Sequence, residues 1–187
     1  MRTLRRRNDT PKKERGATLV ESAFVIPLLI LLAIGSAEVG LAMIDWLAVG
    51  NAAREGARVG AAAGDYSEAG ENADDLILDV VAQASCAIEH GELTSVRIFK
   101  SDLTGNMIGN AENIYSLNSL NCATNTASWT TNTFAWNPAT RNNKIDNLDI
   151  LAVQITFDHD SITGFLPLFD ATWIDEATMR LEPDTRG

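Results

Sequence analysis

The densest group of titratable side chains in the sequence is Asp158-His159-Asp160. A histidine between two carboxylates could bind a metal ion or act as a catalytic base. However, residues 149–158 are rich in β-branched side chains and predict a strand, in which neighbouring side chains point to opposite faces. The sequence also has no glycine-rich phosphate loop, no CxxC pair and no HExxH motif. We therefore expect no enzyme, no metal site and no cofactor.

The second candidate chemistry is a disulfide between the two cysteines of the chain, Cys86 and Cys122. A pair of cysteines tends to form a bridge in an oxidising compartment. If this part of the chain is exported, we expect the bridge, and it would tie a polar segment to a helix predicted over residues 71–90. The alternative is a pair of buried thiols.

Charge is distributed very unevenly along the 187 residues, whose formal net charge is −10. Residues 1–16 carry seven basic and two acidic side chains, a net charge of +5, whereas residues 17–187 carry 8 basic and 23 acidic ones, a net charge of −15. The length suits one modest domain. Because a nucleic-acid-binding protein carries basic residues on its folded part, the acidic remainder excludes nucleic acid as the expected partner.

An uncharged apolar segment, residues 22–37, follows the basic stretch, and apolar residues resume after Glu38 as far as Ile44. Residues 22–44 would form about 34 Å of helix, enough to cross a bilayer core. The basic residues on the N-terminal side predict that this end stays in the cytoplasm and that the rest lies outside. A secretory signal cleaved around 35–37 and a permanent anchor both fit this pattern.

A third interpretation depends on the residues just before the apolar segment, Arg15-Gly16-Ala17-Thr18-Leu19-Val20-Glu21. A basic leader that ends in glycine, with a carboxylate five residues later, resembles the processing site of type IV prepilins. More widely, RGATLVESAFVIPLLILLAIGSAEVG and NAAREGARVGAAAG resemble the TadE-like family, the minor pseudopilins of tight-adherence (Tad, type IVb) pili. The resemblance is firm over 16–64 and looser over 150–183, and residues 67–148 carry no family signature.

The resemblance implies a sequence of processing and assembly. A prepilin peptidase would cut after Gly16, so that residues 1–16 are a leader and Ala17 becomes the N-terminus. The mature chain would cross the bacterial inner membrane once and associate with the major pilin, other minor pseudopilins and the pilus assembly platform. The alternative function is a membrane-anchored extracytoplasmic binding module that is neither processed nor polymerised.

Two carboxylates stand in or beside the apolar segment. An ionised carboxylate is costly inside a bilayer, so Glu21 either pairs with the terminal amine of a neighbouring subunit or lies among lipid headgroups. Glu38 either lies at the outer interface or meets a partner, and Asp45, seven residues on, shares its helix face. The resemblance favours an assembly role for both glutamates.

We expect an α+β fold in which a long pilin-like transmembrane helix, 17–64, precedes an extracytoplasmic domain, 65–187. Gly56, Gly60 and Gly64 recur every four residues and predict close helix packing, although they also fit a helix that frays at its end. The domain should contain one further helix, 71–90, with Leu76, Val80, Ala84 and Ala87 on its apolar stripe. Its antiparallel sheet should have three to four strands, including 93–100, 149–158 and 171–181.

Residues 110–147 contain ten asparagines and nine serines or threonines among 38 residues, a composition typical of a loop. The aromatic residues in this segment, Trp129, Phe134 and Trp136, either fold back onto the sheet, which we expect, or contact a partner. Residues 165–169 predict a buried or interfacial connector.

Overall fold

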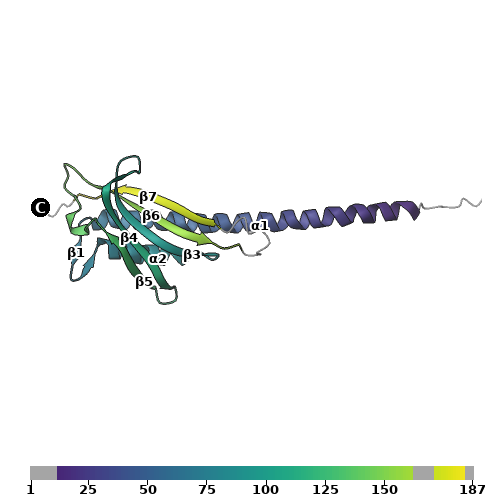
Figure 1. The fold of residues 1–187 in the computed structure, drawn as a ribbon, viewed down its shortest axis with the longest axis horizontal. Coiled ribbons are helices and arrows are strands. Elements are labelled where there is room, and N and C mark those ends of the chain that lie inside the picture. Colours follow the sequence, from purple (N-terminus) through teal and green to yellow (C-terminus); the bar gives the residue numbers. More distant parts are fainter. Residues whose placement is uncertain (1–11, 162–170, 184–187) are drawn as a thin grey trace, which may run out of the picture.

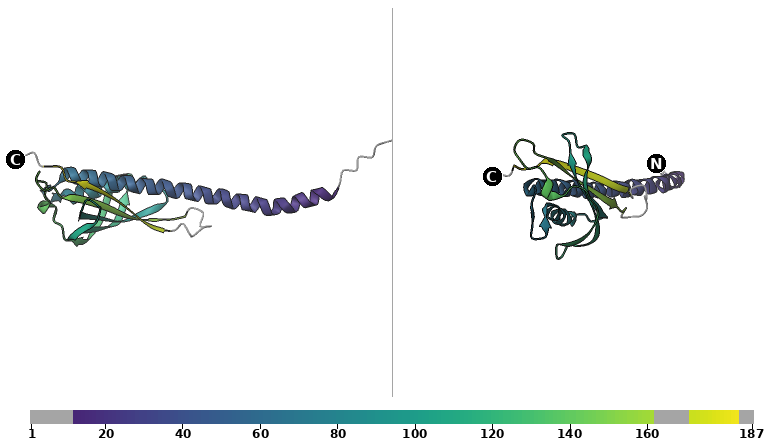
Figure 2. Two further views of the ribbon diagram at one scale, coloured as in Figure 1. Left: turned by 90° about the horizontal axis from the view of Figure 1, so that it is seen from above. Right: turned by 60° about the vertical axis from the view of Figure 1, so that its left-hand side comes forward.

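A long helix, α1 (Lys12–Ala63), dominates the fold (Figure 1). The computed structural model describes residues 12–161 and 171–183, so most of the predicted leader and the predicted connector 165–169 lie outside the described residues. The helix continues through Pro27 and curves along its length (Figure 2). It ends where Gly64 adopts a φ of +59°, a left-handed conformation that glycine tolerates and that commonly terminates helices.

The second half of α1 lies beside a five-stranded antiparallel sheet in the order β5-β4-β3-β6-β7. A separate two-stranded sheet, β1 (Ser67–Glu68) and β2 (Glu71–Asn72), leads into helix α2 (Ala73–Ser85). A short 3₁₀ helix, η1 (Pro138–Thr140), follows β5. The strands of the large sheet are β3 (Gly91–Ser101), β4 (Met107–Asn121), β5 (Thr126–Phe134), β6 (Ile150–His159) and β7 (Ala171–Arg180).

The expected α+β architecture and the strands predicted near 93–100, 149–158 and 171–181 are confirmed, but the sheet has five strands instead of three to four. The additional strands, β4 and β5, form a hairpin over most of residues 110–147, where the prediction of a loop is wrong. Polar side chains bond across this hairpin in place of apolar packing: Thr130 donates to Asn118, and Asn132 donates to Ser116. Such cross-strand pairs stabilise a sheet without the apolar alternation that predicts one.

Helices α1 and α2 lie side by side against one face of the sheet (Figure 2). The Asn72 side chain accepts from the Asp74 backbone N–H, and the Asp75 carboxylate accepts from the Asn72 N–H, which together cap the start of α2. The predicted apolar stripe of this helix is wrong by about one residue. Its buried side chains are Ala73, Asp74, Ile77, Leu78, Val81, Ala82 and Ser85.

Two glycines of α1 lie where the helix contacts both α2 and β6. A Cβ atom on Gly56 would stand 2.7 Å from Val81 Cγ2 and 3.3 Å from Val153 Cγ1. A Cβ atom on Gly60 would stand 2.7 Å from Ile77 Cδ1 and 3.0 Å from a Leu151 methyl group. The two positions therefore leave room for α1 to approach its own domain, whereas Gly64 ends the helix.

We predict that Gly56→Ala destabilises the domain although alanine is the better helix former. The added methyl group meets Val81, whose branched side chain has little rotamer freedom, and overpacking of this kind typically costs about 1–3 kcal/mol. The gain in helix propensity of about 1 kcal/mol offsets only part of that cost. Thermal unfolding of the full chain in detergent would measure the difference.

Gly40→Ala is the matched control, because no heavy atom lies within 4 Å of the position that its Cβ would occupy. We expect this variant to unfold at or above the wild-type temperature. Equal melting temperatures for the two variants would contradict the close approach at Gly56.

Candidate functional site

None of the described residues in the first half of α1 is buried. Among the described residues α1 is the one helix long and apolar enough to cross a membrane, and its most apolar stretch is entirely unburied. Glu21 is exposed on this half, and nothing lies within 4 Å of the position that a Cβ on Gly16 would occupy. A single N-terminal helix of this kind indicates a single-pass membrane anchor. Its large exposed side chains are Leu19, Val20, Phe24, Val25, Ile26, Leu28, Leu29, Ile30, Leu31 and Leu32.

The two acids farther along α1 are both inside the fold. Glu38 and Asp45 are each 1% exposed and lie on the helix face that the domain covers. One oxygen of Asp45 accepts from the Glu89 backbone N–H at 3.2 Å, and the other lies 3.2 Å from His159 Nδ1. Neither acid is therefore at the exposed surface of the helix.

His159 completes this buried site from the end of β6. Its ring stacks on Trp173 of β7, with 5.0 Å between ring centroids and 7° between planes. Asp158 points to the other face of the sheet and accepts from the Thr172 hydroxyl. The triplet Asp158-His159-Asp160 thus splits as the strand pattern predicts, and the acid beside His159 comes from α1.

Asp74 is at the centre of a second buried polar group, which the sequence analysis missed. This fully buried carboxylate accepts from Asn113 Nδ2 at 2.6 Å and from the Tyr115 hydroxyl at 2.8 Å, and it forms an ion pair with buried Arg141. The Arg141 guanidinium lies 4.4 Å from the centre of the Trp136 ring. The group joins the start of α2 to β4 and to the segment that follows β5. A faint sequence signal was present, because Arg141 ends an uncharged segment of 28 residues, 113–140.

Tyr115 contributes a neutral donor to this group. Burial, followed by the negative charge of Asp74 and the hydrogen bond to it, raises the pKa of the Tyr115 hydroxyl well above its usual value. The phenol therefore keeps its proton and continues to donate to Asp74 at any physiological pH.

Of the three aromatic residues predicted either to fold back onto the sheet or to contact a partner, two fold back and one does not. Trp136 is buried beneath Arg141, and Trp129 is partly buried against the core, as expected for side chains that fold back. Phe134 is 52% exposed at the end of β5 and does not fold back.

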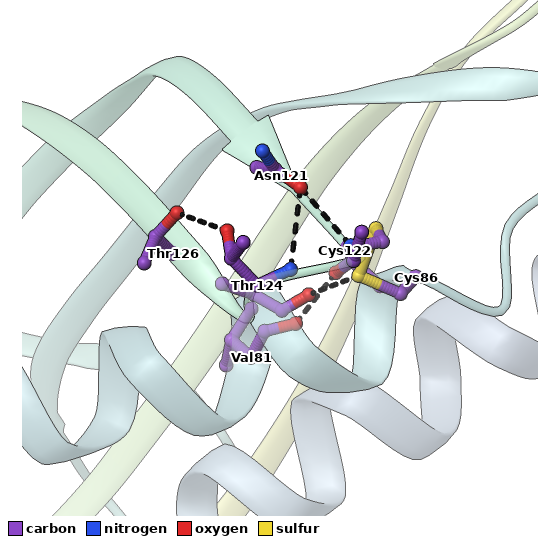
Figure 3. Close-up of a disulfide and its surroundings, with 9 residues drawn as sticks. Val81, Cys86, Asn121, Cys122, Thr124 and Thr126 are labelled. Atoms are coloured by element: carbon purple, nitrogen blue, oxygen red, sulfur yellow. Dashed lines mark hydrogen bonds between the residues drawn. A yellow bond between two sulfur atoms is a disulfide. The ribbon is translucent and has the colours of Figure 1, made fainter.

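A disulfide joins Cys86, at the end of α2, to Cys122, in the turn between β4 and β5 (Figure 3). Asn121 and Thr124 hold that turn, since the Asn121 side chain accepts from the Thr124 backbone N–H. The β4–β5 hairpin is consequently attached to both ends of α2, by the Asp74 group at the start and by the disulfide at the end. Within the described ranges, no group of three or more His, Cys, Asp and Glu side chains is placed to hold a metal ion.

We predict that Asp74→Ala destabilises the domain by about 3–5 kcal/mol, because it leaves the buried charge of Arg141 without a partner. Chemical denaturation of the full chain in detergent would give the free energy of unfolding. Asp79→Ala, on the exposed side of α2, is the control and should change that value by about 0.5 kcal/mol or less. If both variants lose the same small amount of stability, the Asp74 group does not hold α2 in place.

Comparison with known proteins bears on α1 alone. Residues 16–58 match the family model described as TadE-like protein. No curated protein and no solved structure matches the chain. The matched segment includes Gly16, Ala17, Glu21, Glu38 and Gly56, so it extends from the predicted processing site well into the half of α1 that packs against the domain. The resemblance to the TadE-like family, which is not a known family of enzymes, is thereby confirmed over residues 16–58, and it relates the chain to the proteins of Tad pili.

Proposed function

We propose that the chain is a minor pseudopilin that takes part in the assembly of a Tad pilus after a prepilin peptidase has cut behind Gly16. The observation that carries the proposal is where the family match falls on the structure. About half of the match, residues 16–37, covers the part of α1 in which no described residue is buried, and this part bears Gly16, Ala17 and Glu21. An uncovered apolar helix with one exposed carboxylate near its start is the surface that an assembling subunit needs.

The region around Gly16 suits cleavage. A glycine in a helix costs about 1 kcal/mol relative to alanine, so this part of α1 unwinds more readily into the extended form that a protease binds. No neighbouring side chain obstructs the position. Cleavage there would remove the basic leader, 1–16, and place a new amino group on Ala17.

Glu21 provides a charge through which the mature helix can bind an adjacent subunit. Its side chain is exposed on α1 and lies about 6 Å along the helix from Ala17. A carboxylate in an apolar environment is stabilised when a cation neutralises it, and the Ala17 amine of an adjacent subunit would do so. Glu38, in contrast, is buried within the fold of its own chain, so we assign the contact between subunits to Glu21.

The orientation follows from charge and from cysteine chemistry. The basic residues before Gly16 support a cytoplasmic N-terminus for the precursor. The bridge between Cys86 and Cys122 is of the kind that persists in an oxidising compartment, which supports an extracytoplasmic domain over 65–187. The chain would then cross the inner membrane once, and its partners would be the major pilin, other minor pseudopilins and the assembly platform.

We predict that Glu21→Leu leaves insertion, cleavage and folding intact but prevents pilus assembly. Removing one partner of a buried ion pair typically costs about 3–5 kcal/mol, because the other charge is left unpaired. Glu21→Asp should be intermediate, since the charge survives on a shorter side chain. Pilus counts by electron microscopy and co-purification with pilus subunits would measure the effect.

Glu68→Leu, which removes an exposed carboxylate from the domain, is the control and should assemble normally. Intact mass and disulfide content in the same membranes would show that each variant is processed and folded. Normal piliation in a strain whose single copy carries Glu21→Leu would refute the assembly role and favour a membrane-anchored binding module.

A further inference from the structure

Between residues 38 and 47, α1 has two very different faces. One face is covered by the domain and carries Glu38, Ala42 and Asp45, all of them buried. The opposite face is uncovered and apolar. We call its exposed members the open strip: Val39 (52% exposed), Met43 (49%), Ile44 (57%), Trp46 (47%) and Leu47 (57%).

The open strip continues the apolar surface of the first half of the helix. Glu38 and Asp45 are the only charged residues between Glu21 and Arg54, and both are buried, so the exposed surface of α1 is uncharged from 22 to 53. From residue 22 to Leu47 this uncharged surface is about 38 Å long. The apolar core of a bilayer is about 30 Å thick, so an upright helix whose uncharged surface begins at one edge of that core would leave residues 43–47 beyond the other edge.

The strip also has a defined end. Asn51, Arg54 and Arg58 follow on the uncovered side of α1, and all three are exposed. Trp46 stands just before this change from apolar to polar character. Tryptophan is enriched where a helix leaves the hydrocarbon region, because its ring is apolar and its N–H bonds to water or headgroups.

We propose that the open strip rests in the outer interface of the membrane and that α1 crosses the bilayer at a tilt, with its uncovered face leaning on the lipid. A helix whose apolar surface exceeds the bilayer thickness commonly tilts, over a range of about 0–40°. The domain does not obstruct this tilt, because it covers the opposite face of the helix. Trp46 then lies at headgroup level, and the domain is held close above the membrane surface.

Lipid is the occupant that the observations favour over a second copy of the chain. The strip is continuous with the surface that crosses the membrane, and its end is marked by an interfacial tryptophan followed by arginines. The proposal needs only a membrane anchor, so it can hold or fail independently of a role in pili.

Spin labels on the full chain in vesicles of phosphatidylcholine and phosphatidylglycerol would test this contact. Met43→Cys and Leu47→Cys place a label on the strip, and the native cysteines are held in their disulfide. Ile174→Cys is the matched control, because Ile174 is a 60% exposed apolar residue of β7 beside Trp173, which stacks on His159 near Asp45. It therefore stands at a similar level along the molecule as the strip but on another surface.

We expect labels at 43 and 47 to collide severalfold more with oxygen, which concentrates in lipid, and severalfold less with a water-soluble nickel chelate than the label at 174. Equal accessibility to nickel at all three positions would overturn the proposal. Spin–spin broadening at 43 and 47 that disappears as the lipid-to-protein ratio rises would also overturn it, because the strip would then be covered by a second copy. The two strip labels replace exposed side chains, so failure of one variant to fold leaves the other to decide.

Discussion

The packing of the second half of α1 against the sheet and α2 is the contact on which the rest of the structure depends. It takes place through small residues, since Gly56 and Gly60 leave the space that Val81, Ile77 and Leu151 occupy. The same helix continues without interruption into the apolar half that suits a membrane. Anchor and domain are therefore not two units joined by a linker, and the helix carries the orientation of one directly to the other.

This packing also determines that the two acids in the middle of α1 are buried and not exposed. In the sequence, Glu38 and Asp45 interrupt an apolar run and leave its length ambiguous. In the structure both are turned inside, where Asp45 meets His159 and the Glu89 backbone, so the outer surface of the helix remains uncharged well past them. Because both acids are buried, the uncharged surface of the helix is longer than the hydrocarbon core of a bilayer, and the domain covers only one side of the helix.

The domain itself is small, and its hairpin has little apolar surface to hold it. The uncharged β4–β5 hairpin is attached to α2 at two points, by the buried Asp74–Arg141 pair and by the Cys86–Cys122 bridge. Asn113 and Tyr115 donate two further hydrogen bonds to Asp74, whereas Arg141 Nε and Nη1 have no hydrogen-bond partner among the described residues. The part of the chain with the weakest sequence signal is thus held by the most specific contacts.

The features predicted from the sequence are those that local chemistry encodes. The long helix follows from a run of mostly apolar and small residues, and the strands near 93–100, 149–158 and 171–181 follow from partial alternation and β-branched residues. The β4–β5 hairpin could not be predicted in this way, because Asn, Ser and Thr side chains that bond across strands have the composition of a loop. The apolar face of α2 was predicted about one residue away from its position, although residues 77–78 and 81–82 are apolar at helical spacing. Only the burial of Asp74 beside them is invisible to a pattern of apolar residues. The contacts of Asp45 with His159 and of Asp74 with Arg141 join residues far apart in the chain and have no local signature.

We propose that the precursor is cut after Gly16, which leaves α1 with a free amine at Ala17, close to Glu21. The intact mass of the native chain, extracted from its own membranes and kept unreduced, tests this claim most directly. The account predicts a single species that begins at Ala17 and is two hydrogens lighter than the reduced chain, since Cys86 and Cys122 are joined. A species that begins at Met1 would leave only a membrane-anchored module, and one that begins at Glu38 would show that the apolar half of α1 is a discarded secretory signal.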